Sequence, residues 1–319
     1  MPEKVTISGV ELILSEPANV NMEWVGNDEL IQQLKAAWMI VDKDDLPLNP
    51  RILGKPGVGK TTLAYAAGRR LEKEVYMFQC TMDTRPEDLL ISPVIASDNK
   101  IAYVASSLVS AMIKGGVCLL DEGNRMSEKS WASLAPLMDK RRYVESIIAG
   151  VRIYAHKDFR LCVTMNADAS TYEIPEYIQS RLQPKIYIDF PNKIDELKIL
   201  KYNLPFSSEE ILKYCVDFLQ NAHIHDEPYT VRDGINILRY YIKTRLMNNE
   251  KQDVIEKKRF ENAMIQVLEE AALKYLPENY EEFLKQQKES ISFKIFKDID
   301  DVHNYYDKLI KKSDKDSNE

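Results

Sequence analysis

The sequence predicts an α/β fold in which a parallel β-sheet precedes a helical region. Short apolar segments alternate with helical segments as far as residue 190, and from residue 192 onward the apolar residues recur at helical spacing. The third observation is the segment GKPGVGKTT at residues 54–62, which joins an apolar strand to a helix. Together these features predict a P-loop sheet followed by a small all-helical domain.

Residues 54–62 match the pattern G-x-x-x-x-G-K-[ST] of a phosphate-binding loop. The glycines let successive backbone N–H groups turn towards phosphate oxygens, the lysine reaches the terminal phosphates, and the first hydroxyl ligates Mg²⁺. A glycine turn without a ligand is the alternative, and the flanking strand and helix argue against it. The residues expected to hold the nucleotide are Gly54, Pro56, Gly57, Val58, Gly59, Lys60, Thr61 and Thr62.

The composition is that of a soluble globular protein. The 319 residues are 45% hydrophobic and 29% charged, and no apolar run approaches the roughly 18 residues that span a bilayer, so we expect a cytoplasmic protein. The formal charge of −7 argues against a protein that wraps nucleic acid, because such proteins neutralise phosphates with basic patches. The four cysteines lie far apart in apolar runs, which favours core positions over metal or disulfide sites.

The elements before and around the loop follow from apolar patterning. Residues 5–7 and 10–14 predict two short β-strands separated by a Ser-Gly turn. A helix is expected to begin near Asp28, because apolar residues recur on one face from Leu30 to Trp38. Residues 51–53 predict the strand that enters the loop, and residues 61–71 predict the helix that leaves it.

Four further strands are expected after the loop helix, at residues 74–80, 116–122, 160–166 and 185–190. Residues 84–88 (TRPED) have the composition of a helix start, and residues 92–104 predict a β-hairpin inserted into the α/β pattern. Parallel strands that alternate with helices bind ligands at their carboxyl ends. The site is therefore expected at that edge of the sheet.

The helical region begins after residue 192. Residues 207–210 (SSEE) match a capping box ahead of one helix, Thr230 is expected to cap a second, and residues 254–276 predict a third. We expect a nucleotide-binding core over residues 1–192, a helical lid over 193–250, a helical extension over 251–310, and a disordered tail over 311–319.

Asp121 and Glu122 end an apolar strand and supply the two carboxylates that hydrolysis of a nucleotide needs. One carboxylate holds the Mg²⁺ shell, and the second orients or deprotonates the attacking water. We expect Asp121, together with Thr61, to be the metal ligand and Glu122 to be the catalytic base. The alternative is that both acids lie in a solvated turn.

Asn166 and Arg232 are further catalytic candidates. Asn166 ends the next strand on the same edge, where its amide can hydrogen-bond the attacking water and the γ-phosphate; an Asx-turn is the alternative. Arg232 follows the capping Thr230 in the first turn of a helix, where the helix dipole disfavours a cation. A bound phosphate would compensate for this cation, and so would the neighbouring Asp233.

Five motifs stand in a fixed order: the loop at 54–62, DEGNR at 121–125, TMNAD at 164–168, SRL at 180–182 and TVRD at 230–233. Together they resemble the AAA+ superfamily, and within it the MoxR-like and dynein-related branch, over about residues 24–245. The resemblance implies an AAA+ core with a helical lid, a helix insert near residues 92–104 and a pre-sensor hairpin at 142–156. It also implies that Asn166 is sensor 1, Arg181 an arginine finger that reaches a neighbouring subunit, and Arg232 sensor 2.

Two positions depart from the usual motifs of this family. The sensor asparagine is followed by Ala-Asp where proline is usual, and the finger lies in Ser-Arg-Leu where Asp-Arg-Phe is usual. The charge supplied in trans could therefore come from Arg125, Arg141 or Arg142 instead of Arg181.

Residues 192–195 have the pattern N-K-x-D, which recognises guanine in small GTPases. The companion pattern D-x-x-G does not stand at Asp121. We therefore interpret Asn192 as the residue that opens a helix.

The resemblance implies an ATPase that uses Mg²⁺ and remodels other proteins. It implies a homo-oligomer, usually a hexameric ring, and a client protein that is matured or activated, often beside a protein with a von Willebrand factor A domain. Two alternatives remain open. One is a nucleic-acid-linked or restriction-type NTPase motor, which DNA-stimulated hydrolysis would reveal. The other is a nucleotide-gated scaffold, against which the intact Glu122 argues.

Overall fold

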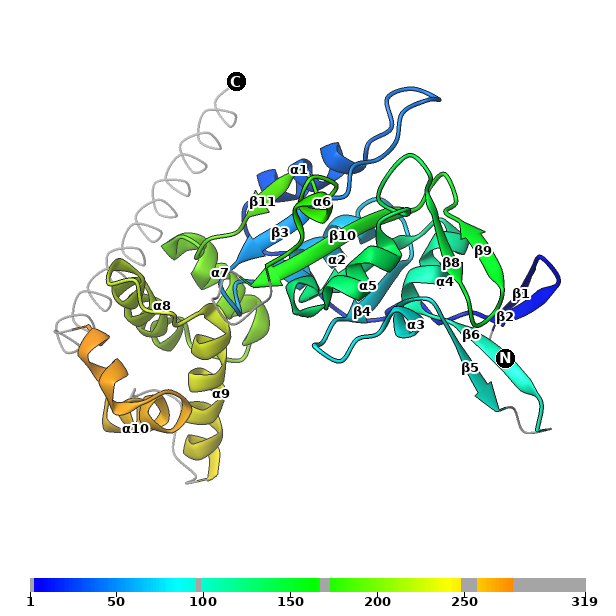
Figure 1. The fold of residues 1–319 in the computed structure, drawn as a ribbon. Coiled ribbons are helices and arrows are strands. Elements are labelled where there is room, and N and C mark those ends of the chain that lie inside the picture. The colour runs from blue at the N-terminus through cyan, green and yellow to red at the C-terminus, as the bar shows by residue number, and fades with distance from the viewer. Residues whose placement is uncertain (1–2, 96–98, 167–172, 248–256, 278–319) are drawn as a thin grey trace, which may run out of the picture. The chain divides into compact units, whose positions relative to one another are not determined.

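The computed structural model describes residues 3–95, 99–166, 173–247 and 257–277 (Figure 1). The chain divides into two compact units. The first contains residues 1–199 with Thr230–Arg232, and the second contains residues 200–229 and 233–319. Each unit is described by itself.

A five-stranded parallel sheet forms the centre of the first unit, in the order β11-β3-β10-β7-β4. The predicted α/β fold is confirmed. The strand register places Gly54 beside Asn166, and Gln79 beside Asp121. The strands are β3 (Arg51–Gly54), β4 (Val75–Gln79), β7 (Val117–Asp121), β10 (Arg160–Asn166) and β11 (Lys185–Tyr187). The carboxyl ends of neighbouring strands therefore meet at one edge, as expected for a ligand site.

Helices cover both faces of this sheet. The consecutive residues Leu119 and Leu120 belong to different hydrophobic clusters, because successive side chains of a strand point to opposite faces. On one face pack α1 (Asp28–Trp38) and α2 (Lys60–Arg69). On the other face pack α4 (Ser107–Lys114) and α5 (Glu128–Leu134). Burial of apolar side chains on both faces makes these strands the hydrophobic centre of the unit.

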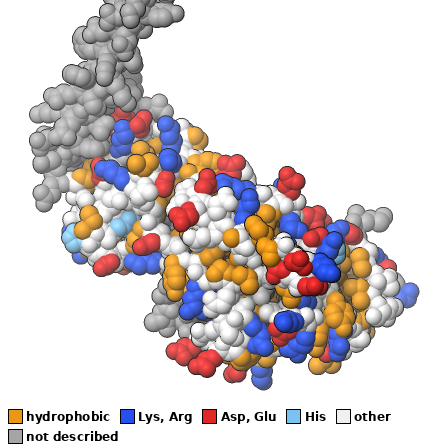
Figure 2. All heavy atoms as spheres, turned by 90° about the horizontal axis from the view of Figure 1, so that it is seen from above, with side chains coloured by type: hydrophobic (Ala, Val, Ile, Leu, Met, Phe, Trp, Pro, Cys, Tyr) orange, Lys and Arg blue, Asp and Glu red, His pale blue; other side chains and the backbone are white. Residues whose placement is uncertain are grey.

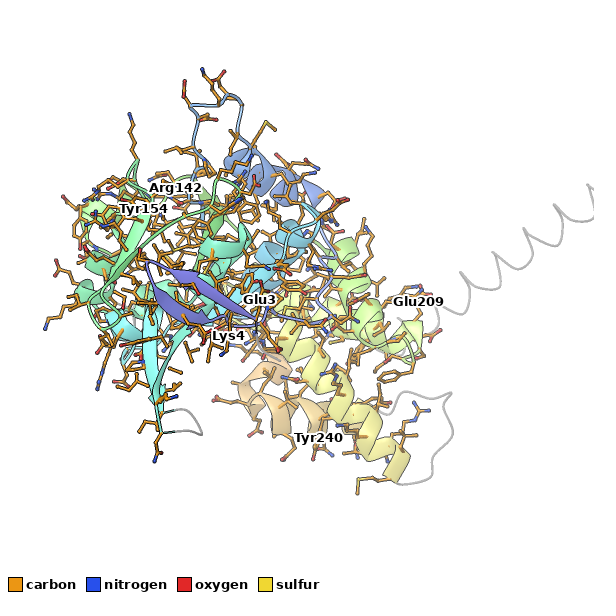
Figure 3. The ribbon with its side chains drawn as sticks, turned by 90° about the vertical axis from the view of Figure 1, so that its right-hand side faces the viewer. Glu3, Lys4, Arg142, Tyr154, Glu209 and Tyr240 are labelled. Atoms are coloured by element: carbon orange, nitrogen blue, oxygen red, sulfur yellow. The ribbon has the colours of Figure 1, made fainter. Side chains whose placement is uncertain are left out.

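The N-terminal hairpin and the inserted hairpin join into one sheet, which the sequence did not predict. The strands β1 (Lys4–Ile7) and β2 (Val10–Ile13) pair with β6 (Ile101–Ala105) and β5 (Ile91–Ile95) in the order β1-β2-β6-β5. The hairpin is held to α4 by an ion pair of 2.8 Å between Lys114 and Glu3, and Figure 3 shows Glu3 and Lys4 at its first strand. No local sequence pattern predicts the pairing of β2 with β6, because about 90 residues separate the two strands.

A third hairpin lies before β10 and corresponds to the expected pre-sensor hairpin. Its strands are β8 (Tyr143–Ser146) and β9 (Val151–Tyr154). The rings of Tyr143 and Tyr154 meet edge to face at 5.7 Å on the outer side, and Figure 3 labels Arg142 and Tyr154 at the base of the hairpin. At the tip, Ile147 is 93% exposed. The turn of the hairpin thus presents an apolar side chain to solvent.

Short elements connect these parts of the first unit. They are α3 (Pro86–Leu89), the 3-10 turn η1 (Gly123–Arg125) and α6 (Glu176–Gln179). The helix α7 (Lys193–Asn203) begins in the first unit. Asn192 caps it, because the Asn192 side-chain oxygen accepts hydrogen bonds from the backbone N–H groups of Ile194 (3.0 Å) and Asp195 (2.9 Å). The interpretation of N-K-x-D as a helix start is confirmed.

The second unit is helical, with α8 (Glu209–Ile224), α9 (Val231–Met247), α10 (Lys257–Val267) and the 3-10 turn η2 (Glu270–Tyr275). Its core includes an edge-to-face pair of Tyr214 and Phe260 at 5.0 Å. The prediction of one helix over residues 254–276 is wrong. Glu269 is extended, and the chain turns so that the Tyr275 carbonyl accepts a hydrogen bond from Asn221 at 3.2 Å. Tertiary contacts override the helical pattern here. Residues 254–256 and the expected tail at 311–319 lie outside the described residues.

The four cysteines are buried and free, and burial raises the pKa of the Cys80, Cys118 and Cys162 thiols. In the described part of the chain, His, Cys, Asp and Glu side chains form no group of three or more that could hold a metal ion. Over the same residues, every helix is too short or too polar to cross a membrane. On the face shown in Figure 2, acidic and basic side chains are interspersed.

Candidate functional site

The phosphate-binding loop connects β3 to α2 and owes its shape to its glycines. Gly57 (φ +84°) and Gly59 (φ +97°) adopt left-handed conformations that L side chains rarely take. A Cβ atom on Gly54 would lie 2.5 Å from the carbonyl oxygen of Ile188, so a larger residue would displace the neighbouring chain. The loop can therefore bring backbone N–H groups close to a phosphate, as the sequence motif predicts.

Lys60 is the first residue of α2, and its side chain folds back over the loop. Its Nζ donates hydrogen bonds to the carbonyl oxygens of Gly54 (2.9 Å) and Lys55 (2.8 Å), and the residue is only 7% exposed. A buried ammonium needs anionic or carbonyl partners. Phosphate oxygens are stronger partners than carbonyls, so Lys60 is placed to bind the terminal phosphates of a nucleotide.

Thr61 and Asp121 meet although 60 residues separate them. The Thr61 hydroxyl donates to Asp121 Oδ1 at 2.8 Å, and the Thr164 hydroxyl donates to the same oxygen. Hydroxyl and carboxylate oxygens are the ligands that Mg²⁺ prefers, and Mg²⁺ commonly takes few protein ligands and completes its shell with water and phosphate. The pair Thr61 and Asp121 therefore fits the metal site predicted from the sequence.

Glu122 follows Asp121 in a left-handed conformation (φ +55°). This conformation turns the backbone sharply at the end of β7, and the Glu122 N–H donates to the Thr164 hydroxyl at 3.1 Å. Glu122 Oε1 accepts from the Asn166 amide at 3.2 Å, and Oε2 accepts from the Gln79 amide at 3.2 Å. The carboxylate is therefore held between the ends of β4 and β10. It does not lie in a freely solvated turn.

Asn166 is 8% exposed, and its side chain points to Glu122. The Asn124 amide donates to the Asn166 carbonyl at 2.9 Å, which fixes the end of β10 to the turn η1. Gly123 in this turn packs so closely on Val163 that a Cβ atom would clash with it. The structure brings the predicted base and the predicted sensor together. The residues Ala167 and Asp168 that follow lie outside the described part of the chain.

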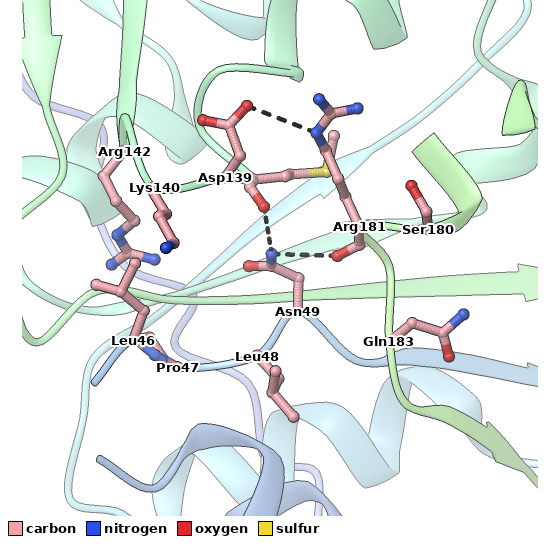
Figure 4. Close-up of a pocket in the computed structure, with 11 residues that line it drawn as sticks. Leu46, Pro47, Leu48, Asn49, Asp139, Lys140, Arg142, Ser180, Arg181 and Gln183 are labelled. Atoms are coloured by element: carbon pink, nitrogen blue, oxygen red, sulfur yellow. Dashed lines mark hydrogen bonds and ion pairs between the residues drawn. The ribbon is translucent and has the colours of Figure 1, made fainter. Parts of the chain in front are cut away.

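Arg181 lies at the opposite end of the sheet from the loop. Asn49, two residues before β3, donates its side-chain amide to the Arg181 carbonyl at 3.3 Å, whereas the loop follows the last residue of β3. Arg181 Nε lies 3.6 Å from Asp139 Oδ2 (Figure 4). Its Nη1 donates to the Tyr177 carbonyl at 2.6 Å. Arg181 is thus placed away from the nucleotide loop of its own chain.

The alternative arginines occupy two places. Arg141 and Arg142 lie with Arg181 near a cavity of about 260 Å³, where Arg141 pairs with Asp139 at 2.8 Å. The hydrogen bond from Arg141 lowers the pKa of the Asp139 carboxyl. Arg142 donates to the Phe159 carbonyl at 3.2 Å. Arg125, in contrast, lies beside Glu122.

The cavity near Arg181 is lined by Leu46, Pro47, Leu48, Asn49, Met138, Asp139, Lys140, Arg142, Ser180, Arg181 and Gln183.

Arg232 is the second residue of α9 and is exposed. The segment Thr230–Arg232 belongs to the same compact unit as the loop. A Cβ atom on Gly57 would lie 2.5 Å from the Thr230 hydroxyl, so this segment packs on the loop. The role of Arg232 towards a phosphate stays a prediction.

Comparison with known proteins finds a domain match in the first unit. Residues 51–182 match the model of the AAA domain of the dynein-related subfamily. This range contains the loop, both acids, Asn166 and Arg181. Residues 51–182 of this chain are therefore similar to an AAA domain of the dynein-related subfamily. The resemblance to the MoxR-like and dynein-related branch that the motifs suggested is thereby confirmed.

Individual proteins are also similar to this chain. The denitrification regulatory protein NirQ of Pseudomonas aeruginosa is 30% identical over 136 residues, which are 43% of this chain and 50% of NirQ. This chain therefore matches about half the length of NirQ. An uncharacterised protein of Staphylococcus aureus is 24% identical over 202 residues, or 59% of this chain and 76% of that protein. The RuvB Holliday junction branch migration motor of Thermotoga maritima shares the fold, with a TM-score of 0.52, 16% identity, and coverage of 77% of this chain and 72% of RuvB.

Two residues of the AAA+ site were not found from the sequence. Gln79 reaches Glu122 because β4 pairs with β7, and its position at a strand end was the only available signal. Trp24 precedes α1 and lies beside the loop, since a Cβ atom on Gly59 would be 3.3 Å from the indole ring. No sequence pattern indicates this contact.

We predict that nucleotide binding to the AAA+ protein changes its tryptophan fluorescence through Trp24. The other two tryptophans, Trp38 and Trp131, are each 1% exposed in the cores on the two faces of the sheet, whereas Trp24 is partly exposed beside Gly59. Titration of the wild-type protein with ATP should therefore give a saturable change that is missing in Trp24→Phe. An unaltered response of Trp24→Phe would show that another tryptophan senses the nucleotide.

Proposed function

We propose that this AAA+ protein hydrolyses ATP with Mg²⁺ and uses the energy to remodel or activate a partner protein. The observation that carries the proposal is the meeting of Thr61, Asp121 and Glu122 at the carboxyl edge of the sheet, next to a complete phosphate-binding loop. This geometry joins a metal-ligand pair to a second carboxylate, as hydrolysis of a nucleoside triphosphate requires.

Each residue has a defined task in this proposal. Lys60 and the loop N–H groups bind the β- and γ-phosphates, while Thr61 and Asp121 hold Mg²⁺, which neutralises the charge on the phosphates. Glu122 accepts a proton from the attacking water, and Asn166 orients that water or the γ-phosphate. The hydrogen bond from Asn166 to Glu122 supports a shared role of these two groups.

We further propose that the protein forms a ring, usually a hexamer in this family, in which Arg181 reaches the nucleotide of a neighbouring subunit. Its position at the end of the sheet opposite the loop supports action in trans, because a cation there is remote from its own phosphates. Arg181 must leave Asp139 to do so.

Arg181→Ala should leave ATP binding intact and lower hydrolysis by roughly 10³-fold, the loss expected of an arginine finger. Mixing Arg181→Ala subunits with Glu122→Gln subunits should restore part of the activity, because some interfaces then combine a wild-type Glu122 with a wild-type Arg181. The measurement is the phosphate release rate against the mixing ratio. A rate that stays at the level of the separate variants would exclude Arg181 as the trans arginine.

The partner is proposed from the family, as a client protein that acts in some cases beside a protein with a von Willebrand factor A domain. The exposed Ile147 at the tip of the β8–β9 hairpin supports contact with a polypeptide. The name of NirQ, a denitrification regulatory protein, is consistent with action on another protein. The absence of a spanning helix in the described residues fits the proposed cytoplasmic location.

The test is the ATPase rate of the purified chain with the protein that co-purifies with the Glu122→Gln variant. Stimulation by that protein, and conversion of it to an altered state only with ATP, would support the proposal. Stimulation by DNA without any effect of the protein would favour the nucleic-acid motor instead.

A further inference from the structure

Arg125 forms an ion pair with the proposed catalytic base of its own chain. Its Nε lies 2.6 Å from Glu122 Oε2, and the two side chains are 36% and 32% exposed. The geometry is that of an ion pair and not of an aligned hydrogen bond. Of the three arginines considered as alternatives to Arg181, Arg125 is thus the one that contacts a proposed catalytic residue of its own chain.

The contacts of Glu122 divide unequally between its two oxygens. Oε2 faces both the Gln79 amide and the Arg125 guanidinium, whereas Oε1 accepts one hydrogen bond from the residues that the structure describes, that of Asn166. A carboxylate oxygen has two lone pairs, so Oε2 is occupied and Oε1 keeps one position. The second lone pair of Oε1 can therefore accept a hydrogen bond from a water molecule, next to the hydrogen bond from Asn166.

We infer that Arg125 is a positioning residue, which acts in the same subunit to turn Glu122 so that Oε1 is presented to the attacking water. This inference rests on the proposed ATP hydrolysis. Arg125 works with Gln79: the guanidinium and the amide fix Oε2, and the remaining oxygen takes the proton from water as the water oxygen attacks the γ-phosphorus. The proton passes to Glu122, and the bond between the β–γ bridging oxygen and the γ-phosphorus breaks.

The local structure makes Arg125 suited to this task. It belongs to the turn η1, three residues after Glu122, and its backbone N–H donates to the Glu122 carbonyl at 2.9 Å. The same turn is fixed to β10 through Asn124 and through the close packing of Gly123 on Val163. The guanidinium is therefore anchored by a short, well-supported segment, and a positioning group needs such support to hold a base within about half an ångström.

The first experiment compares Arg125→Ala and Arg125→Lys with the wild-type chain. Arg125→Ala should lower kcat about tenfold while the Kd for ATP stays within about twofold, because the lost contact orients the base and does not touch the nucleotide. Arg125→Lys keeps the positive charge and should recover part of kcat. Arg70→Ala is the matched control, since Arg70 forms a surface ion pair with Asp28 at 2.7 Å and should behave as wild type.

Subunit mixing separates action in cis from action in trans. Glu122→Gln subunits mixed with Arg125→Ala subunits should show no recovery, because no site then has both a wild-type Glu122 and its own Arg125. The same mixture with Arg181→Ala recovers activity under the ring proposal and serves as the positive control. Recovery with Arg125→Ala would overturn the inference and make Arg125 a trans arginine.

A double variant checks that Arg125 acts through Glu122. Adding Arg125→Ala to Glu122→Gln should not lower the residual rate further, whereas independent effects would multiply. If the wild type hydrolyses ATP and Glu122→Gln does not, but Arg125→Ala equals wild type, then the inference fails and the proposed function stands. If the wild type itself does not hydrolyse ATP, then the proposed function fails.

Discussion

Lys60→Ala is expected to abolish nucleotide binding, with a Kd for ATP at least roughly 100-fold higher, which corresponds to about 2.7 kcal/mol. Two effects act together. The variant removes the cation that meets the terminal phosphates, and it removes the hydrogen bonds from Nζ to the Gly54 and Lys55 carbonyls that hold the loop closed. The measurement is calorimetric titration with a non-hydrolysable ATP analogue in the presence of Mg²⁺.

Lys114→Ala is the matched control for this prediction. Lys114 ends α4 and pairs with Glu3 on the surface, so its loss should leave ATP binding unchanged. Circular dichroism and thermal unfolding show whether Lys60→Ala is folded. A folded Lys60→Ala protein that binds ATP as tightly as wild type would contradict the assignment of the loop.

Glu122→Gln is expected to lower kcat by roughly 10²–10³-fold, the range for loss of a general base, with ATP binding retained. Glutamine keeps the shape, and its single oxygen can accept a hydrogen bond from either the Asn166 amide or the Gln79 amide, but it cannot accept a proton. Single-turnover hydrolysis separates this loss in the chemical step from any change in product release.

Asp121→Asn provides the contrast to Glu122→Gln. Asp121 receives the Thr61 and Thr164 hydroxyls and is the proposed Mg²⁺ ligand. Its variant should therefore raise the Mg²⁺ concentration needed for half-maximal activity and lower the rate. If Glu122→Gln retained wild-type turnover, the base would be another group, and the proposed division of labour between the two acids would be wrong.

Most of the core elements were accessible from the sequence. The strands that become β3, β7 and β10 are short apolar runs that end in polar residues, and the inserted hairpin was visible as two strands around a turn. The prediction of one helix over residues 254–276 was wrong, since contacts of Tyr275 with Asn221 and Glu227 redirect the chain after Val267. Periodicity reports which face is apolar, but it does not report where packing ends a helix.

The sequence by itself determined the loop, the acidic pair and Asn166, because each depends on residues that are adjacent in the chain. The glycines allow a tight turn, the lysine and hydroxyls can bind phosphate and Mg²⁺, and the polar groups stand at strand ends. Only the tertiary structure decided that Gln79 and Arg125 hold Glu122, that Trp24 lies on the loop, and that Arg181 lies at the far end of the sheet. The physical reason is the strand order β11-β3-β10-β7-β4, which is not the order along the chain. Which strands pair is determined by burial of the two apolar faces of the sheet. That burial depends on packing between residues that are distant in the sequence.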